Sequence, residues 1–135
     1  HAARMAPLPI LAAALALCGS GPRQTCVVDG DTFWLNGEKI RIADINAPET
    51  YHASCPLERK RGEVAKRRLA ELLGAGPFKL DVQGRAKDRY GRALRVVTRG
   101  GRSLGAQLVD EGLAEPWRGK RSDWCNGLAA RLPAS

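Results

Sequence analysis

The chain has 135 residues, which is enough for one domain with a hydrophobic core and too few for two domains of ordinary size. Its 22 Lys and Arg residues outnumber 14 Asp and Glu residues, so the formal net charge is +8. This excess favours a polyanionic partner, although a solvated cationic surface without such a partner would have the same composition. An apolar run at residues 8–17 is too short for a membrane-spanning helix, which needs about 20 residues.

We expect residues 1–24 to be a leader and linker, followed by a single domain over residues 25–135. The apolar run follows Arg4 and is followed by small residues, which is the pattern of a signal peptide. A buried core helix is the alternative interpretation. Cys18 comes directly after the run, so both simple cleavage and acylation of this cysteine, as in a lipoprotein, remain open. We therefore expect an exported protein, periplasmic or secreted, attached to a membrane only through a lipid anchor or an uncleaved leader.

Three cysteines remain if the leader is removed, and disulfides persist in an oxidising compartment. Cys55 lies in a predicted loop and Cys125 lies near a predicted tail. We expect these two cysteines to pair. Cys26 is then expected to stay buried as a small apolar residue.

Short β-rich runs separated by turn residues predict about five strands. The Asn36-Gly37 pair between two such runs is a strong hairpin signal, because both turn residues need positive φ. The expected strands cover residues 25–28, 32–35, 38–43, 77–82 and 93–98.

Two helices are expected among these strands. Residues 57–73 form an amphipathic pattern that Gly74 ends, and their Lys and Arg residues are read as a solvated face. Ser103 can cap a shorter helix that runs through Glu111. The tail at residues 115–135 shows no clear period. About five strands with two helices predict an α+β, mainly β, domain built on a partly open five-stranded OB-fold barrel.

Two clusters contain the residue types that phosphodiester hydrolysis requires. A carboxylate such as Asp31 suits a hard cation, and a glutamate such as Glu49 can orient and deprotonate a water molecule. Arginines present planar donor groups that match phosphate and stay charged as negative charge develops. Without further information, these residues would be read as turn acids and surface arginines.

The order and spacing of these motifs resemble the thermonuclease family, that is, staphylococcal-nuclease-like domains, over residues 25–118. Arg41 is followed eight residues later by Glu49. The other matching segments are Val28-Asp-Gly-Asp-Thr32, Ala47-Pro-Glu-Thr50, Asp88-Arg-Tyr-Gly-Arg92 and the stretch from Leu108 to Ala114.

The resemblance implies a role for each matching residue. Asp31 would be a Ca²⁺ ligand, Glu49 the general base or water-orienting group, and Arg41 and Arg92 the groups that grip the scissile phosphate. Three further residues are implied in substrate binding. Tyr90 would contact phosphate beside the basic Arg89, and Trp117 would stack on a base unless it packs on the barrel instead.

One position departs from the family pattern. Asn46 stands where a second metal-ligating aspartate is common, so its amide oxygen would ligate without contributing charge. Ala47 can offer only its backbone carbonyl. Asp44 lies two residues before Asn46 and would share its side of an extended chain, so it can supply the missing charge. The alternative is that Asp44 is an exposed aspartate paired with an arginine.

The sequence therefore predicts a monomeric, Ca²⁺-dependent or other divalent-metal-dependent nuclease that hydrolyses DNA, RNA or both with little sequence preference. One alternative is a binding module with the same barrel, in which Asn46 has weakened the metal site. Another is an envelope-associated protein that holds anionic polymers on its cationic face.

Overall fold

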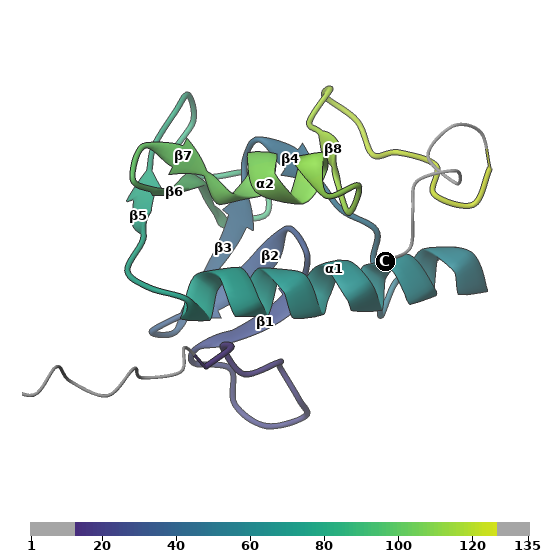
Figure 1. The fold of residues 1–135 in the computed structure, drawn as a ribbon, viewed down its shortest axis with the longest axis horizontal. Helices are drawn as coiled ribbons and strands as arrows, with labels where there is room; N and C mark the ends of the chain where they lie inside the picture. The colour runs from purple at the N-terminus through teal and green to yellow at the C-terminus, as the bar shows by residue number, and fades with distance from the viewer. Residues whose placement is uncertain (1–12, 127–135) are drawn as a thin grey trace, which may run out of the picture.

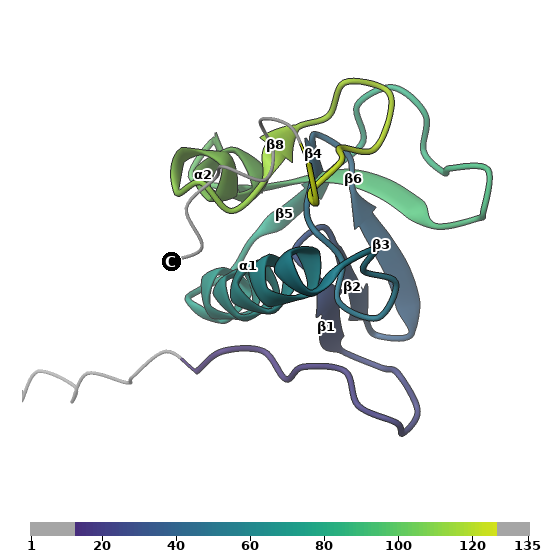
Figure 2. The same ribbon diagram turned by 90° about the vertical axis from the view of Figure 1, so that its right-hand side faces the viewer.

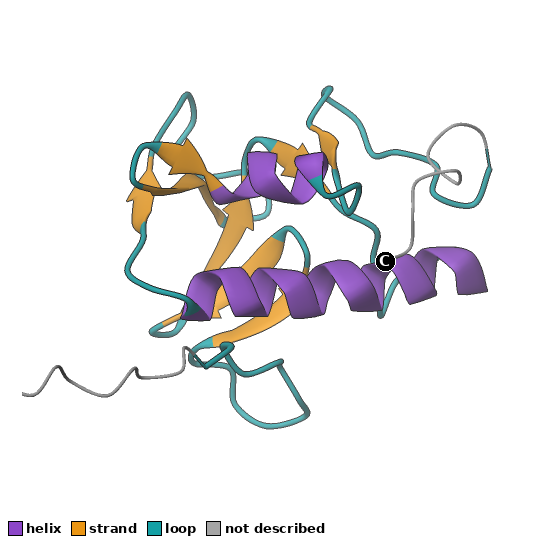
Figure 3. Ribbon diagram, in the orientation of Figure 1, coloured by secondary structure: helices purple, strands orange, loops and turns teal. Residues whose placement is uncertain are grey.

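A computed structural model describes residues 13–126, which form eight strands and two helices (Figures 1 and 3). Five strands form one path in the order β1, β2, β3, β6 and β5, and β7 pairs with β6. Strands β4 and β8 form a separate pair. The strands are β1 (Cys26–Asp29), β2 (Thr32–Leu35), β3 (Glu38–Ile42), β4 (Ile45–Asn46), β5 (Lys79–Asp81), β6 (Ala93–Arg99), β7 (Arg102–Ser103) and β8 (Glu115–Pro116). The helices are α1 (Pro56–Gly74) and α2 (Leu104–Asp110).

The predicted hairpin is confirmed between β2 and β3. Asn36 and Gly37 have φ angles of 50° and 84°, the left-handed conformation that this turn requires. The turn fixes a register in which Phe33 faces Ile40, and both side chains are fully buried. Burial alternates along β3, where Ile40 and Ile42 are buried, as the two-residue period of an extended chain predicts. On β2, by contrast, the adjacent Thr32 and Phe33 are both buried.

The sheet continues from β3 to β6 in parallel, with Arg41 opposite Leu94. A parallel pairing needs a long crossover, and α1 and β5 lie within that connection. Figure 2 shows both helices on the same side of the strands. The five-strand path with two helices confirms the predicted α+β, OB-like architecture.

Helix α1 supplies much of the core and begins and ends within a residue of its predicted bounds. Pro56 occupies the first turn, and the Cys55 sulfur accepts a hydrogen bond from the Glu58 backbone N–H at 3.4 Å. Its apolar face, which includes Ala65 and Leu69, is buried against the sheet. The prediction of a wholly solvated basic face was wrong at Lys66, which is 5% exposed and places its ammonium 5.1 Å from the Tyr51 ring centre.

Cys26 is buried as predicted, but it does not remain unpaired, because a disulfide joins it to Cys18. Residues 15–18 lie along β1. The Val27 N–H donates to the Ala16 carbonyl, and the Cys18 N–H donates to the Val27 carbonyl, both at 2.9 Å. This backbone pairing brings the two cysteines within bonding distance. A sulfur in a disulfide cannot also be acylated, so this fold and a lipid anchor at Cys18 exclude each other. The predicted leader and linker covered residues 1–24, of which residues 1–12 lie outside the described residues.

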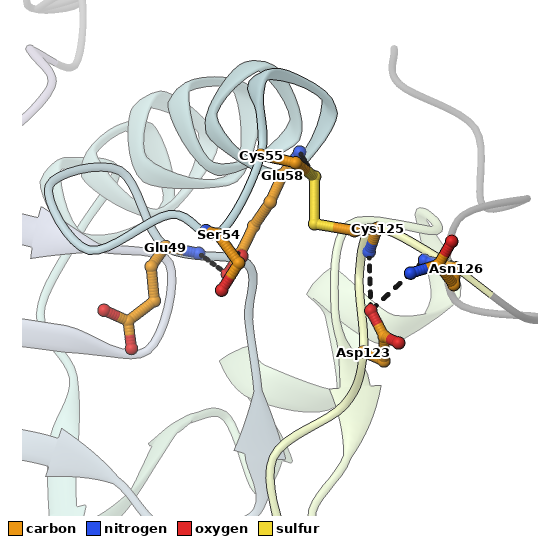
Figure 4. The surroundings of a disulfide bond; sticks show 7 residues. All are labelled: Glu49, Ser54, Cys55, Glu58, Asp123, Cys125 and Asn126. Carbon is orange, nitrogen blue, oxygen red and sulfur yellow. Dashed lines mark hydrogen bonds between the residues drawn. A yellow bond between two sulfur atoms is a disulfide. The ribbon is translucent and has the colours of Figure 1, made fainter.

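The expected pairing of Cys55 with Cys125 is confirmed. It connects the loop before α1 to the tail after β8, and Figure 4 shows the bond at the start of α1. The neighbouring Trp124 is 2% exposed, so the tail has its own apolar anchor in the domain. Between residues 13 and 126, no helix is long and apolar enough to cross a membrane.

Candidate active site

The turn between β1 and β2 is tied to the loop at residues 47–50 by two buried carboxylates. Asp31 accepts hydrogen bonds from the Ala47 N–H and from the Thr32 hydroxyl, both at 2.9 Å. Asp29 accepts from the backbone N–H and the hydroxyl of Thr50, at 3.0 and 2.9 Å. The two carboxylates therefore fix the loop on both sides of Glu49.

Glycine is required between these carboxylates because the turn lies against α1. A Cβ at Gly30 would lie 2.8 Å from the Ala65 Cβ and 3.0 Å from the Ala47 Cβ. Burial raises the pKa of Asp29 to about 6, and the nearby charges of Asp31 and Glu49 add to the shift. The turn thus concentrates negative charge at one place in the site.

The backbone of Glu49 is held from a third side by α1. Its N–H donates to the buried Glu58 carboxylate at 3.0 Å, and the second oxygen of Glu58 accepts from the Ser54 N–H at 2.8 Å (Figure 4). Figure 4 shows the Glu49 side chain directed away from Glu58 and from the disulfide. The carboxylate of Glu49 is thus left available to other partners.

Close packing beneath this loop makes Gly62 a sensitive position. A Cβ there would lie 2.4 Å from the Glu49 carbonyl oxygen and 3.1 Å from the Pro48 oxygen. Alanine normally stabilises a helix interior by about 1 kcal/mol relative to glycine, but here the clash opposes that gain. We expect Gly62→Ala to lower the free energy of unfolding by about 1–3 kcal/mol in urea denaturation. Gly76→Ala is the control, because its Cβ would meet no atom closer than 3.6 Å, and equal stability of the two variants would contradict the prediction.

Arg41 lies on β3 with its guanidinium largely buried. One nitrogen donates to the carbonyls of Ile42 and of Ile45, the latter at 2.9 Å, and another lies 3.6 Å from the Asp31 carboxylate. Its guanidinium also lies 5.4 Å from the centre of the Trp117 ring. These contacts hold the positive charge beside Asp31.

Arg92 lies one residue before β6, the strand that pairs with the strand of Arg41. The Asp88 carboxylate accepts from the Arg92 side chain at 2.6 Å and from its backbone N–H at 2.9 Å. Burial opposes ionisation of Asp88, but the hydrogen bonds from Arg92 and Tyr90 lower its pKa overall. Asp88 therefore orients Arg92.

Arg89 and Tyr90, which were predicted to bind substrate, form one exposed cluster. Tyr90 is 69% exposed, and its hydroxyl accepts a hydrogen bond from Arg89 at 2.8 Å. The guanidinium groups of Arg89 and Arg92 lie 4.9 and 5.5 Å from the Tyr90 ring centre. An aromatic ring and two positive charges thus face the solvent together.

The residues proposed for the metal site fall into two places. Asn46 is 2% exposed on β4, and its side-chain nitrogen has no hydrogen-bond partner. Ala47 follows it and bonds to Asp31. Asp44, however, accepts a hydrogen bond from the Ser103 hydroxyl at 2.6 Å. Its other carboxylate oxygen lies so near Gly105 that a Cβ there would be only 2.7 Å away. Its carboxylate therefore faces the start of α2. The sequence left open that Asp44 pairs with an arginine, but its partner is the hydroxyl of Ser103.

Sequence reasoning missed two residues at the site. Glu58 holds the Glu49 loop, and its place three residues after Cys55 at a helix start was an available signal. Arg121 forms an ion pair with the Glu49 carboxylate. No sequence pattern indicated that pair, because Arg121 lies in the tail that shows no period.

The fold and the site together define an OB-like domain in which two buried carboxylates, Arg41 and the loop of Glu49 lie beside the turn between β1 and β2. Comparison with known proteins extends this description. The family model described as "Staphylococcal nuclease homologue" matches residues 39–132. The chain therefore belongs to the staphylococcal nuclease homologue family.

Several of the matching relatives are named as bacterial nucleases. Micrococcal nuclease of Shigella flexneri is 35% identical over 143 residues, covering 88% of this chain and 76% of that protein. Thermonuclease of Staphylococcus intermedius is 30% identical over 92 residues, covering 65% and 54%. Endonuclease YhcR of Bacillus subtilis (strain 168) is 36% identical over 99 residues, covering 65% of this chain but only 8% of that protein. The chain thus matches only part of the length of several relatives.

Proposed function

We propose that this chain is a nuclease that hydrolyses the phosphodiester bonds of DNA, RNA or both with little sequence preference. The observation that carries the proposal is the joint fixation of Glu49, Arg41 and Asp31 by the turn between β1 and β2. Membership of a nuclease family and relatives named as nucleases support the same activity. The two disulfides favour an exported enzyme, and we propose that it acts as a monomer.

Each residue has a distinct chemical task in this proposal. Glu49 orients a water molecule and accepts its proton as the water attacks phosphorus. Arg41 and Arg92 donate hydrogen bonds to the phosphate oxygens, where negative charge increases in the transition state. Tyr90 and Arg89 bind the phosphate from the solvent side, and Trp117 offers a partly exposed ring on which a base can stack.

Ca²⁺ is the proposed cofactor, and it would polarise a phosphoryl oxygen when bound. Asp31, the amide oxygen of Asn46 and the Ala47 carbonyl are the oxygen ligands that we assign to it. The buried carboxylates of Asp29 and Asp31 lie close enough for their charges to interact, and this concentration of negative charge fits a cation. The unpartnered atom of Asn46 is its side-chain nitrogen, which cannot ligate a metal ion. Over residues 13–126 no group of three or more Asp, Glu, His or Cys side chains forms a metal site. Ca²⁺ binding would therefore be weaker than in a site with two aspartates.

The test is release of acid-soluble nucleotides from single-stranded DNA and RNA with Ca²⁺, with other divalent ions and with chelator. We expect chelator to abolish cleavage, and we expect Asp31→Asn to raise the Ca²⁺ concentration for half-maximal rate about tenfold or more. Asp110→Asn, an exposed site at the end of α2, is the control of equal charge change. Cleavage that persists in chelator would refute metal dependence.

A binding module without turnover is the second candidate, because Asn46 replaces a charged ligand in the middle of the site. In that case the chain would bind nucleic acid but release no nucleotides with any ion. The same assay, run beside a binding measurement, separates the two functions.

A further inference from the structure

The tail after β8 crosses the site and is fixed at both ends. At one end, the Trp117 N–H donates to the Asp44 carbonyl at 3.0 Å, and the Trp117 ring lies against Arg41. At the other end, Trp124 is buried and Cys125 is bonded to Cys55. In Figure 1 this segment leads from β8 toward the end of α1 where that helix begins. A segment held in this way presents its middle residues to the site in a defined position.

Arg121 lies halfway between Trp117 and Cys125, and its guanidinium pairs with the Glu49 carboxylate. The Arg121 side chain is 57% exposed, whereas that of Glu49 is 15% exposed. Arg121 therefore reaches the buried carboxylate from the solvent side and stays accessible to a solute. Arg41, by contrast, is 11% exposed and held by backbone carbonyls.

The Arg121 guanidinium can exchange the Glu49 carboxylate for a phosphate of a bound nucleic acid. Its planar group of donors fits carboxylate and phosphate equally well. The phosphate would replace the carboxylate as the partner of Arg121, so the guanidinium stays paired throughout the exchange. The cost of the exchange is that the less exposed Glu49 carboxylate loses its partner. The exchange would also release the Glu49 carboxylate for its proposed task with water.

We propose that Arg121 is a phosphate-binding residue of this site, which pairs with Glu49 in the free protein and moves to a substrate phosphate when nucleic acid binds. The proposal rests on the proposed nuclease site, but it concerns binding and not turnover. The Cys55–Cys125 disulfide keeps Arg121 within reach of both anions.

The experiment measures binding of fluorescent single-stranded DNA by anisotropy, in chelator, at several salt concentrations. Each phosphate contact on a single strand adds about 0.7 to the slope of log K against log salt. We expect Arg121→Ala to weaken binding several-fold and to lower the slope by about that amount, while Arg121→Lys retains most of it. Arg118→Ala is the matched control, because Arg118 lies on the same tail, is 68% exposed and pairs with Glu115.

A double-mutant cycle tests the exchange with Glu49. Glu49→Gln should tighten DNA binding by freeing Arg121, and this gain should be largely lost when Arg121 is already alanine. An unchanged affinity and slope in Arg121→Ala would overturn the proposal, as would equal losses in Arg118→Ala. Absence of cleavage with every metal would refute the nuclease but would leave these binding results intact.

Discussion

Glu49→Gln is expected to lower the rate of nucleic acid cleavage by about 10²–10⁴-fold, because the amide cannot accept a proton from the attacking water. The change keeps the size and shape of the side chain. The backbone contacts of residue 49 with Glu58 should therefore survive, along with the neighbouring bonds at Ala47 and Thr50. The measurement is kcat for release of acid-soluble nucleotides at saturating Ca²⁺.

The control for this variant is Glu38→Gln, which removes the same charge from an exposed position beside the β2–β3 turn. Glu38→Gln should cleave at the wild-type rate. Thermal melting of both variants shows whether the fold is intact. If Glu49→Gln folds normally and keeps more than about a tenth of the wild-type rate, Glu49 is not the general base.

Loss of the Cys55–Cys125 disulfide is expected to lower the free energy of unfolding by about 2–4 kcal/mol, because this bond closes a long loop in the unfolded chain. The two cysteines are separated by 70 residues in the sequence. Cys125→Ser is the better variant, since the Cys55 sulfur also accepts the N-terminal hydrogen bond of α1. Urea denaturation without reductant measures the change, at low protein concentration and mildly acidic pH, so that the free Cys55 thiol does not pair between molecules.

The second disulfide provides an internal comparison. Cys18 and Cys26 are only 8 residues apart, so their bond should contribute less by about 2 kcal/mol on loop entropy alone. Equal losses of stability in Cys125→Ser and in a Cys18→Ser, Cys26→Ser double variant would contradict the entropic argument. An unchanged urea midpoint in Cys125→Ser would show that the tail stays in place without its covalent bond.

Local signals predicted both helices and five of the eight strands, but the two-residue strands β4, β7 and β8 were missed. The Asn36-Gly37 turn, the apolar pattern of α1 and the Ser103 cap of α2 each act within a few residues, so the chain sequence alone specifies them. The pairing of Cys55 with Cys125 was also predicted, because Cys55 lies in a predicted loop and Cys125 lies near a predicted tail. The Cys18–Cys26 bond was missed because Cys18 was assigned to the leader, which left Cys26 without a partner.

The site was predicted as a set of residue types, and the tertiary structure supplied their contacts. The sequence by itself determined five of the strands, both helices and the family motifs, because these depend on short-range periodicity and on spacing along the chain. Only the fold decided that Asp44 faces Ser103, that Gly62 leaves room for the Glu49 carbonyl, and that Arg121 meets Glu49. These contacts join residues separated by 13 to 72 positions, and no local propensity encodes the path that brings such residues together.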